Sequence, residues 1–217
     1  MRLEDGVLTI DGDATCAEVE AAVAPWLFAS DRPDETVRAW IDRGGCDLLA
    51  GWLGPTRAQV LGIEVEGGLR FGGRVVKNVA GYDLARVFVG ARGELGRVVR
   101  AHVRARPAPR GWHAARREGT EPDEALGGPG CAVWVAGATW RFLRHGETAP
   151  RAYEPWAPLD ARAALRADWA GVRSLIPYEG AATDGVLLGG VRLVGVTAPP
   201  TPRADPLWSR LVEAFAG

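Results

Sequence analysis

Glycine is concentrated in two short segments, residues 72–81 and 90–96, and these segments constrain the fold more than any other feature of the chain. Glycine reaches positive φ at little cost, so each segment predicts tight turns and a main chain that another group can approach closely. The only lysine among the 217 residues, Lys77, also lies here. This region is therefore the first candidate for a binding site.

The residues around the first segment predict a β-hairpin followed by a loop. Residues 61–66 alternate apolar and polar side chains, which is typical of a strand with one buried face. Gly67 and Gly68 predict a tight turn, and residues 69–71 predict the returning strand. Residues 77–81 are expected to form an irregular loop.

A short helix and a long strand are expected next. Asp83 is a candidate N-cap, and Gly90 is expected to end the helix. The apolar face of this helix is predicted to consist of Leu84, Val87 and Phe88. In the strand after Gly96, alternation predicts Val99, Ala101, Val103 and Ala105 inside and Arg100, His102, Arg104 and Arg106 outside, with Pro107 closing it.

Two interpretations of the glycines follow from chemistry alone. Runs of glycine and helix N-termini present backbone N–H groups, which suit an anionic phosphate or the edge of a flavin ring. The alternative is that the glycines only form tight turns. Spacing by itself leaves both interpretations open, because glycine clusters are weak signals.

The segment FGGRVVKNVAGYDLARVFVGARGELGRVV at residues 71–99 resembles the second half of the flavin-binding domain of FAD-linked oxidases of the vanillyl-alcohol oxidase type. Within this PCMH-type superfamily it is most similar to the E subunit of bacterial glycolate oxidase, where a GGRVxKNVAGYD segment is followed by GxLG. The resemblance extends over residues 61–107.

The resemblance also implies which residues contact the cofactor. In the family, the main chain of the VAGYD loop and of the GxLGxV turn lies against FAD. Close approach of a backbone to a ring or a phosphate is what glycine permits. Carried over by position, the implied cofactor-binding residues are Val79, Ala80, Gly81, Tyr82, Gly93, Gly96 and Val98.

The N-terminal residues predict one strand and two helices. Residues 7–11 are expected to form the strand, and residues 15–24 an amphipathic helix capped by Thr15 or Asp13. Residues 33–43 predict the second helix. Its first turn is expected to contain Pro33, its apolar face Val37, Trp40 and Ile41, and its end Gly44-Gly45.

The fold class expected from this pattern is α+β. Residues 45–55 resemble a shortened form of the family's GG…SGP segment, and the chain begins after the family's first βαβ unit, whose loop wraps the FAD pyrophosphate. We therefore expect residues 1–107 to form an N-terminally truncated PCMH-type domain in which the second subdomain is largely retained. Each lost charge-assisted hydrogen bond weakens FAD binding by about 1.5–3 kcal/mol. Binding of FAD by the isolated chain is expected to be weak or absent.

The remaining residues, 108–217, are expected to form a small α+β cap-like domain after a boundary near residue 107. Residues 131–136 and 139–144 predict a hairpin, and residues 185–197 predict one or two buried strands. Helices are expected at 160–169 and 206–216. The terminal helix is predicted to turn Leu207, Leu211, Val212 and Phe215 inward.

Composition narrows the functional classes. A formal net charge of −1 gives no case for a nucleic-acid partner. Three widely spaced cysteines argue against a disulfide framework or a zinc site, so no metal ligands are assigned and a cytoplasmic location is expected. The sequence holds neither a secretory signal nor an apolar run long enough for a transmembrane segment.

No catalytic residues can be assigned from the sequence. Oxidation of a 2-hydroxy acid needs a base and a cation for the carboxylate beside the flavin, and no such set is recognisable. His102 is isolated and is best explained as a solvated or packing residue. The exposed arginines Arg100, Arg104 and Arg106 suit either an acidic partner surface or a plain solvated face.

The resemblance implies a place in a complex. The family's E subunit works with a full-length FAD oxidase subunit and an iron–sulfur subunit, so FAD-dependent oxidation of glycolate to glyoxylate is expected mainly in a partner. Two alternatives stay open: a structural subunit that has lost FAD and serves assembly only, and a stand-alone binding module with an unrelated ligand.

Overall fold

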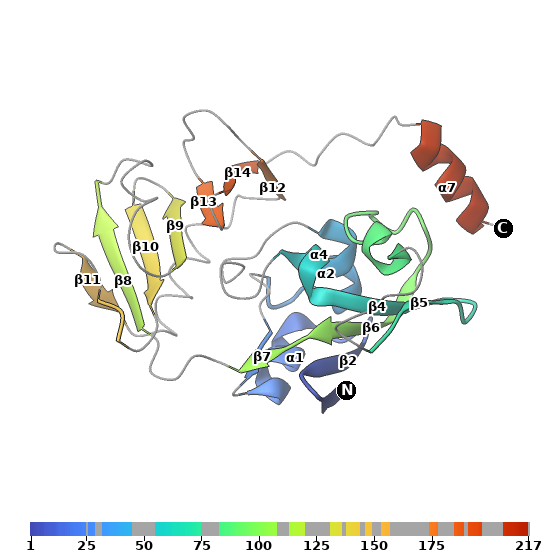
Figure 1. Ribbon diagram of the computed structural model, residues 1–217, viewed down its shortest axis with the longest axis horizontal. Helices are drawn as coiled ribbons and strands as arrows, with labels where there is room; N and C mark the ends of the chain where they lie inside the picture. The colour runs from blue at the N-terminus through green and yellow to red at the C-terminus, as the bar shows by residue number, and fades with distance from the viewer. Residues whose placement is uncertain are drawn as a thin grey trace. The chain divides into compact units, whose positions relative to one another are not determined.

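The computed structural model describes residues 1–24, 26–28, 32–44, 55–74, 83–107, 113–119, 131–135, 138–143, 146–148, 153–156, 174–177, 185–188, 191–196 and 206–216 (Figure 1). The chain divides into two compact units. Unit 1 holds the elements from β1 to β7 together with the C-terminal helix α7, and unit 2 holds β8 to β14. Both helices and strands are present, as the predicted α+β class requires.

Unit 1 is built on a five-stranded sheet in the order β1-β2-β6-β4-β5. The strands are β1 (Arg2–Glu4), β2 (Val7–Asp11), β4 (Val60–Val65), β5 (Arg70–Gly72) and β6 (Val98–Arg104). Every neighbouring pair is antiparallel. A further two-stranded sheet pairs β3 (Trp26–Leu27) with β7 (Arg106–Pro107).

The predicted hairpin between residues 61 and 71 is confirmed. β4 and β5 are joined by Gly67 and Gly68, whose φ angles are 88° and 87°. The turn is closed by hydrogen bonds from Val65 N to Leu69 O at 2.9 Å and from Gly68 N to Val65 O at 3.0 Å. Two consecutive residues at positive φ suit a tight turn between antiparallel strands, which explains the glycine pair.

The prediction that Val99 faces inward is wrong. Val98 is buried and Val99 is exposed, because the register between β4 and β6 shifts: Glu64 pairs with Arg100, while Val65 pairs with Val98. The extra residue of this β-bulge moves one side chain to the other face of the sheet. After the bulge the predicted alternation returns, and Ala101, Val103 and Ala105 are buried.

The first predicted helix is confirmed as α1 (Cys16–Val23), and Thr15 is its N-cap. The Thr15 side chain accepts a hydrogen bond from Glu18 N, and the Glu18 side chain accepts one from Thr15 N at 2.8 Å. This reciprocal pair is a capping box, which satisfies two backbone donors at the start of the helix.

The second helix, α2 (Val37–Arg43), begins later than predicted. Pro33 lies outside the helix, and Thr36 is the N-cap. The reason lies in α1: the N–H groups of Cys16 and Ala17 donate to the carbonyls of Glu35 at 2.8 Å and Pro33 at 2.9 Å. Residues 33–35 therefore serve as acceptors for another helix instead of forming a first turn of their own. The predicted apolar face of Val37, Trp40 and Ile41 is fully buried.

Two short helical turns lie next to strands of the five-stranded sheet in the sequence. α4 (Thr56–Gln59) leads directly into β4. The turn η1 (Leu84–Val87) is a 3-10 helix, and Asp83 makes no capping hydrogen bond with its side chain, unlike the prediction. Phe88 is buried as expected, but Ala85 is the residue of η1 that is fully buried.

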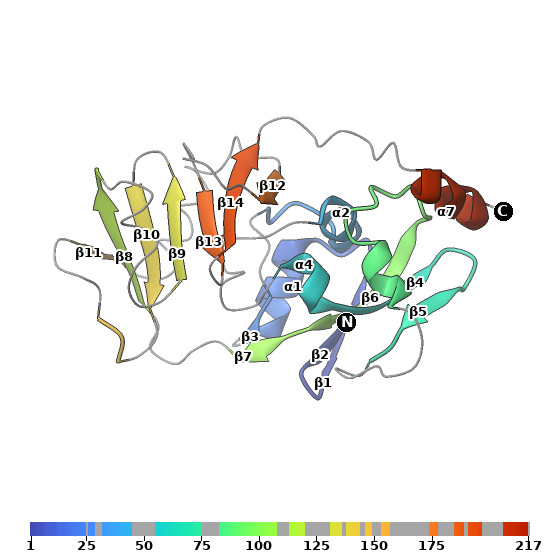
Figure 2. The ribbon, with the colours of Figure 1, turned by 45° about the horizontal axis from the view of Figure 1, so that its top comes forward.

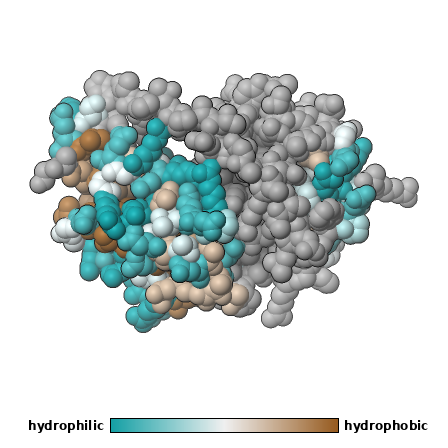
Figure 3. Space-filling model, turned by 180° about the vertical axis from the view of Figure 1, so that it is seen from behind, coloured by the Kyte–Doolittle hydropathy of each residue, from teal (hydrophilic) through white to brown (hydrophobic). Residues whose placement is uncertain are grey.

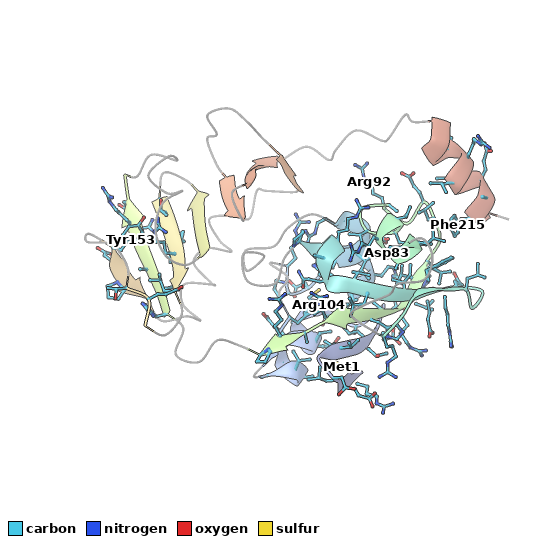
Figure 4. All side chains as sticks on the ribbon, viewed as in Figure 1. Met1, Asp83, Arg92, Arg104, Tyr153 and Phe215 are labelled. Carbon is cyan, nitrogen blue, oxygen red and sulfur yellow. The ribbon has the colours of Figure 1, made fainter. Side chains whose placement is uncertain are left out.

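The C-terminal helix α7 (Pro206–Ala216) packs on the core of unit 1. The predicted inward residues Leu211, Val212 and Phe215 contact this core. Phe215 is labelled in Figure 4. The Phe215 ring lies edge-on to Phe71 and Phe88, with centroids 5.5 Å and 5.4 Å apart. Residues 108–217 were expected to form one domain, whereas the structure groups this helix with unit 1, because its apolar face is buried there.

Unit 2 is a seven-stranded antiparallel sheet in the order β11-β8-β10-β9-β13-β14-β12, which can be followed in Figure 2. Its predicted hairpin is confirmed. Residues 185–197, predicted to form one or two buried strands, contain two paired strands, β13 and β14. Its strands are β8 (His113–Glu118), β9 (Cys131–Val135), β10 (Ala138–Leu143), β11 (Glu154–Trp156), β12 (Ser174–Pro177), β13 (Gly185–Leu188) and β14 (Val191–Val196).

Three predicted features lie outside the described residues: the loop at 77–81, the segment at 45–54 and the helix at 160–169. Within the described ranges, no helix is both long enough and apolar enough to cross a membrane.

Candidate functional site

The second glycine segment closes the end of helix α2. Gly90 N donates to Ile41 O at 2.9 Å, and Arg92 N donates to Asp42 O at 3.0 Å. These bonds satisfy carbonyls of the last helical turn, which have no partner within the helix. A Cβ on Gly44 would lie 3.0 Å from both Cα and N of Gly90, so the two main chains meet directly.

Gly93 sits beside a carboxylate. Its φ is 78°, and a Cβ there would lie 3.7 Å from Oδ2 of Asp42. Burial raises the pKa of the Asp42 carboxyl, and the hydrogen bond from the Gly93 backbone opposes that rise. The N–H of Gly93 is therefore directed at an acidic group of the same chain.

Gly96 has open space next to its main chain. Its φ is 119°, and nothing lies within 4 Å of the position a Cβ would take. Its N–H donates to Gly93 O at 3.2 Å, which closes another turn. Val98, two residues later, starts β6 and is fully buried in the core of unit 1.

The structure thus brings three of the seven proposed cofactor-binding residues, Gly93, Gly96 and Val98, into one turn and the strand that follows it. Val79, Ala80, Gly81 and Tyr82 lie outside the described residues.

The described residues fit FAD only in part. Open space at Gly96 lets a flat group approach the main chain. The N–H groups of Gly93 and Gly96 are used within the chain, and Asp42 places a carboxylate at the turn. A phosphate needs free donors and a positive environment, so this turn suits a ring edge and does not suit the pyrophosphate.

A separate hollow lies on the polar face of the five-stranded sheet. It has a volume of about 420 Å³. Figure 3 shows one face of the molecule, where hydrophilic residues cover most of the described surface of unit 1. Polar and charged side chains predominate in the hollow's lining, which consists of Arg2, Thr9, Ile63, Glu64, Arg70, Phe71, Gly72, Gly73, Arg74, Arg100 and His102.

One row of paired residues crosses the whole sheet at this hollow. Arg2 pairs with Thr9, Thr9 with His102, His102 with Gly62, and Gly62 with Gly72. Nδ1 of His102 lies 3.0 Å from Oγ1 of Thr9. The row therefore places an imidazole near the middle of the sheet, with an arginine at one end and glycines at the other.

Burial lowers the pKa of His102 below its ordinary value of 6.5. Glu64 opposes this shift, while Arg74, Arg100 and Arg70 add to it. At neutral pH the imidazole is therefore uncharged, and it can hold or accept a proton when an anion lies nearby.

Sequence reasoning identified only part of this hollow. Arg100 and His102 were recognised as outward-facing, but Arg2, Thr9, Arg70 and Arg74 were not connected with them. The available signal was the alternation in β2, β4 and β6, which puts polar side chains on one face of each strand. Their alignment into one row depends on strand register, which alternation does not specify. No cluster of metal-ligating residues occurs within the ranges that the structure describes.

Comparisons with known proteins show what part of the chain is similar to others. No family model matches the chain. Glycolate oxidase subunit GlcE of Escherichia coli (strain K12) is 46% identical over 71 residues, which is 31% of this chain and 20% of that protein. Glycolate oxidase subunit GlcD of Bacillus subtilis (strain 168) is 36% identical over 115 residues, which is 49% of this chain and 23% of that protein.

The matches span about a fifth of the length of these two relatives. Among solved structures, alkyldihydroxyacetonephosphate synthase matches in two crystal forms. The TM-scores are 0.43 and 0.44 at 15% and 13% identity, over 52% of this chain and 21% and 23% of those chains.

The predicted resemblance to a subunit of bacterial glycolate oxidase is confirmed. The chain is similar to the subunits GlcE and GlcD, and the glycine-rich motif had indicated the E subunit.

Proposed function

We propose that this chain is a subunit of a cytoplasmic complex that oxidises glycolate to glyoxylate with FAD, and that most of the chemistry takes place in a partner flavin subunit. The observation that carries the proposal is the 46% identity with glycolate oxidase subunit GlcE over 71 residues. The similarity to subunit GlcD supports the same complex.

The proposed partners are a full-length FAD oxidase subunit and an iron–sulfur subunit. FAD, when bound, supplies the group that is reduced by the hydroxy acid. On this proposal residues 79–82, Gly93, Gly96 and Val98 lie toward the cofactor. Because the turn at Gly93 and Gly96 does not suit a pyrophosphate, a partner supplies most of the contacts to that group.

Purification of the tagged full-length chain from its own host, grown on glycolate, tests this proposal. We expect flavin absorbance, iron and two further chains to co-purify, and we expect glycolate to reduce an added dye. The matched preparation uses untagged cells. A chain that purifies alone, with neither flavin nor glycolate-dependent reduction, would contradict the proposal.

A second candidate function is assembly without any contact to the cofactor. It is favoured by the engagement of the Gly93 and Gly96 N–H groups within the chain itself. The variant Gly81→Trp distinguishes the two functions when it is compared with Gly68→Trp, which alters the β4–β5 turn. Loss of flavin from the purified complex in Gly81→Trp alone supports cofactor contact. Unchanged flavin content in both variants supports assembly only.

A further inference from the structure

The hollow on the sheet's polar face is surrounded by more positive than negative charge. Four arginines line it: Arg2, Arg70, Arg74 and Arg100. Two carboxylates bridge them, Glu64 between Arg70 and Arg100, and Glu4 between Arg2 and Arg74. With a neutral His102, this group keeps an excess of two positive charges.

The bridges leave hydrogen-bonding capacity on the arginines. Each guanidinium carries five N–H donors in a fixed fork, and each bridge above is made through one of its nitrogens. Guanidinium forks match the oxygens of phosphate in charge and geometry. The side chains are also held in place, since each glutamate oxygen contacts a different arginine.

The backbone shapes one wall of the hollow. A Cβ on Gly62 would lie 2.8 Å from Gly73 N and 2.9 Å from Gly73 O, so only glycine lets the chain after β5 pass over β4. Gly73 N donates to Leu61 O at 3.2 Å and holds this crossing. Arg74, the next residue, also lines the hollow, and its guanidinium contacts the same Glu4 carboxylate as Arg2.

We propose that this hollow binds a phosphate group, as free phosphate or as a small phosphate monoester. The excess of two positive charges matches a dianion. His102 and Thr9 offer a neutral imidazole and a hydroxyl between the arginines. A volume of about 420 Å³ leaves room for a small organic group beside the phosphate. This site is separate from the glycine turn at residues 90–96.

The test follows the ring signals of the three histidines by NMR in the full-length chain, at fixed pH and constant ionic strength. Inorganic phosphate and glycerol 3-phosphate are titrated separately, with glycolate and chloride as further titrants. We expect phosphate to cause a saturable shift at His102 and none at His113. A bound dianion also raises the pKa of His102, because it favours the imidazolium form.

Matched arginine variants show whether binding is local. Arg100→Gln and Arg97→Gln remove the same charge, and the two parent side chains are exposed to 48% and 49% and are both ion-paired. Arg97 pairs with Asp13 and lies outside the hollow. We expect Arg100→Gln to weaken phosphate binding about tenfold or more, Arg100→Lys to restore part of it, and Arg97→Gln to have little effect.

The relative affinities for phosphate and glycerol 3-phosphate show which of the two ligands the hollow binds. Equal affinity for both phosphates assigns the site to free phosphate, and tighter binding of glycerol 3-phosphate assigns it to a monoester. A linear shift without saturation, an equal loss in Arg97→Gln, or tighter binding of glycolate than of phosphate would each overturn the proposal. Failure here leaves the proposed role in glycolate oxidation untouched, because that role is tested by co-purification and dye reduction and not by phosphate binding.

Discussion

At the scale of single residues, His102 couples stability to pH. Its pKa is lowered in the folded chain, chiefly by burial, whereas in the unfolded chain it is expected near 6.5. As pH falls from about 6.5 through the lower folded value, the unfolded state binds a proton first, so the free energy of unfolding decreases. Above that window both states are neutral and the effect vanishes.

The loss of stability at low pH that His102 causes can be tested with a variant. His102→Gln should lose less stability than the parent chain between pH 7.5 and pH 5, since glutamine does not titrate. Urea unfolding at the two pH values measures the difference between the two proteins, and His113→Gln, on β8 of unit 2, serves as the control. An identical pH dependence for parent and His102→Gln would contradict the assignment of a lowered pKa.

Gly68, in the turn of the β4–β5 hairpin, and Gly72, at the end of β5, differ in what an added methyl group meets. Gly72 has φ 71° and its Cβ would clash with Leu61 O, whereas Gly68 has φ 87° with nothing within 4 Å. Gly68→Ala should therefore lose only about 1 kcal/mol of unfolding free energy, from backbone strain. Gly72→Ala should lose about 2–3 kcal/mol or more, because steric overlap adds to the strain. Denaturant unfolding of both variants checks the difference.

At the scale of elements, the capping box of α1 explains why that helix begins where its sequence predicts. Thr15→Ala removes the side-chain acceptor and should cost about 1 kcal/mol, while Thr15→Ser keeps it and should cost less. Unfolding midpoints of the two variants measure this. Equal losses for alanine and serine would show that the hydroxyl contributes little to the helix start.

The helices also show where local patterns stop being informative. The apolar face of α2 was predictable from spacing, and all three of its residues are buried. The first residue of α2 was not predictable from spacing, because the carbonyls of Pro33 and Glu35 accept hydrogen bonds from α1. A helix start of this kind depends on a second element, and a single-segment pattern carries no information about it.

At the scale of the whole molecule, α7 joins unit 1, although Ala108–Pro199 of unit 2 separate it from the rest of that unit in the sequence. Phe215→Ala should lower the stability of unit 1 by about 2 kcal/mol, below the range for fully buried aromatics because Phe215 is only partly buried. Hydrogen exchange should become faster in β5 and around Phe88 and stay unchanged in β8 to β10. The exposed Glu213→Ala is the matched control, and a uniform change across both units would contradict this packing.

The sequence alone determined the features that arise from neighbouring residues. Alternation located the strands, Gly67 and Gly68 located the turn, and Thr15 or Asp13 was expected to cap α1, since each signal acts over a few positions. The motif at residues 71–99 also indicated the resemblance that the relatives confirm.

Only the tertiary structure decided what depends on distant residues. The bulge at Val99 and the row from Arg2 to Gly72 require the register of several strands, and the position of α7 requires the apolar surface of Phe71 and Phe88. Register and docking are settled by packing among segments far apart in the chain. Side-chain alternation within one segment is compatible with more than one such arrangement.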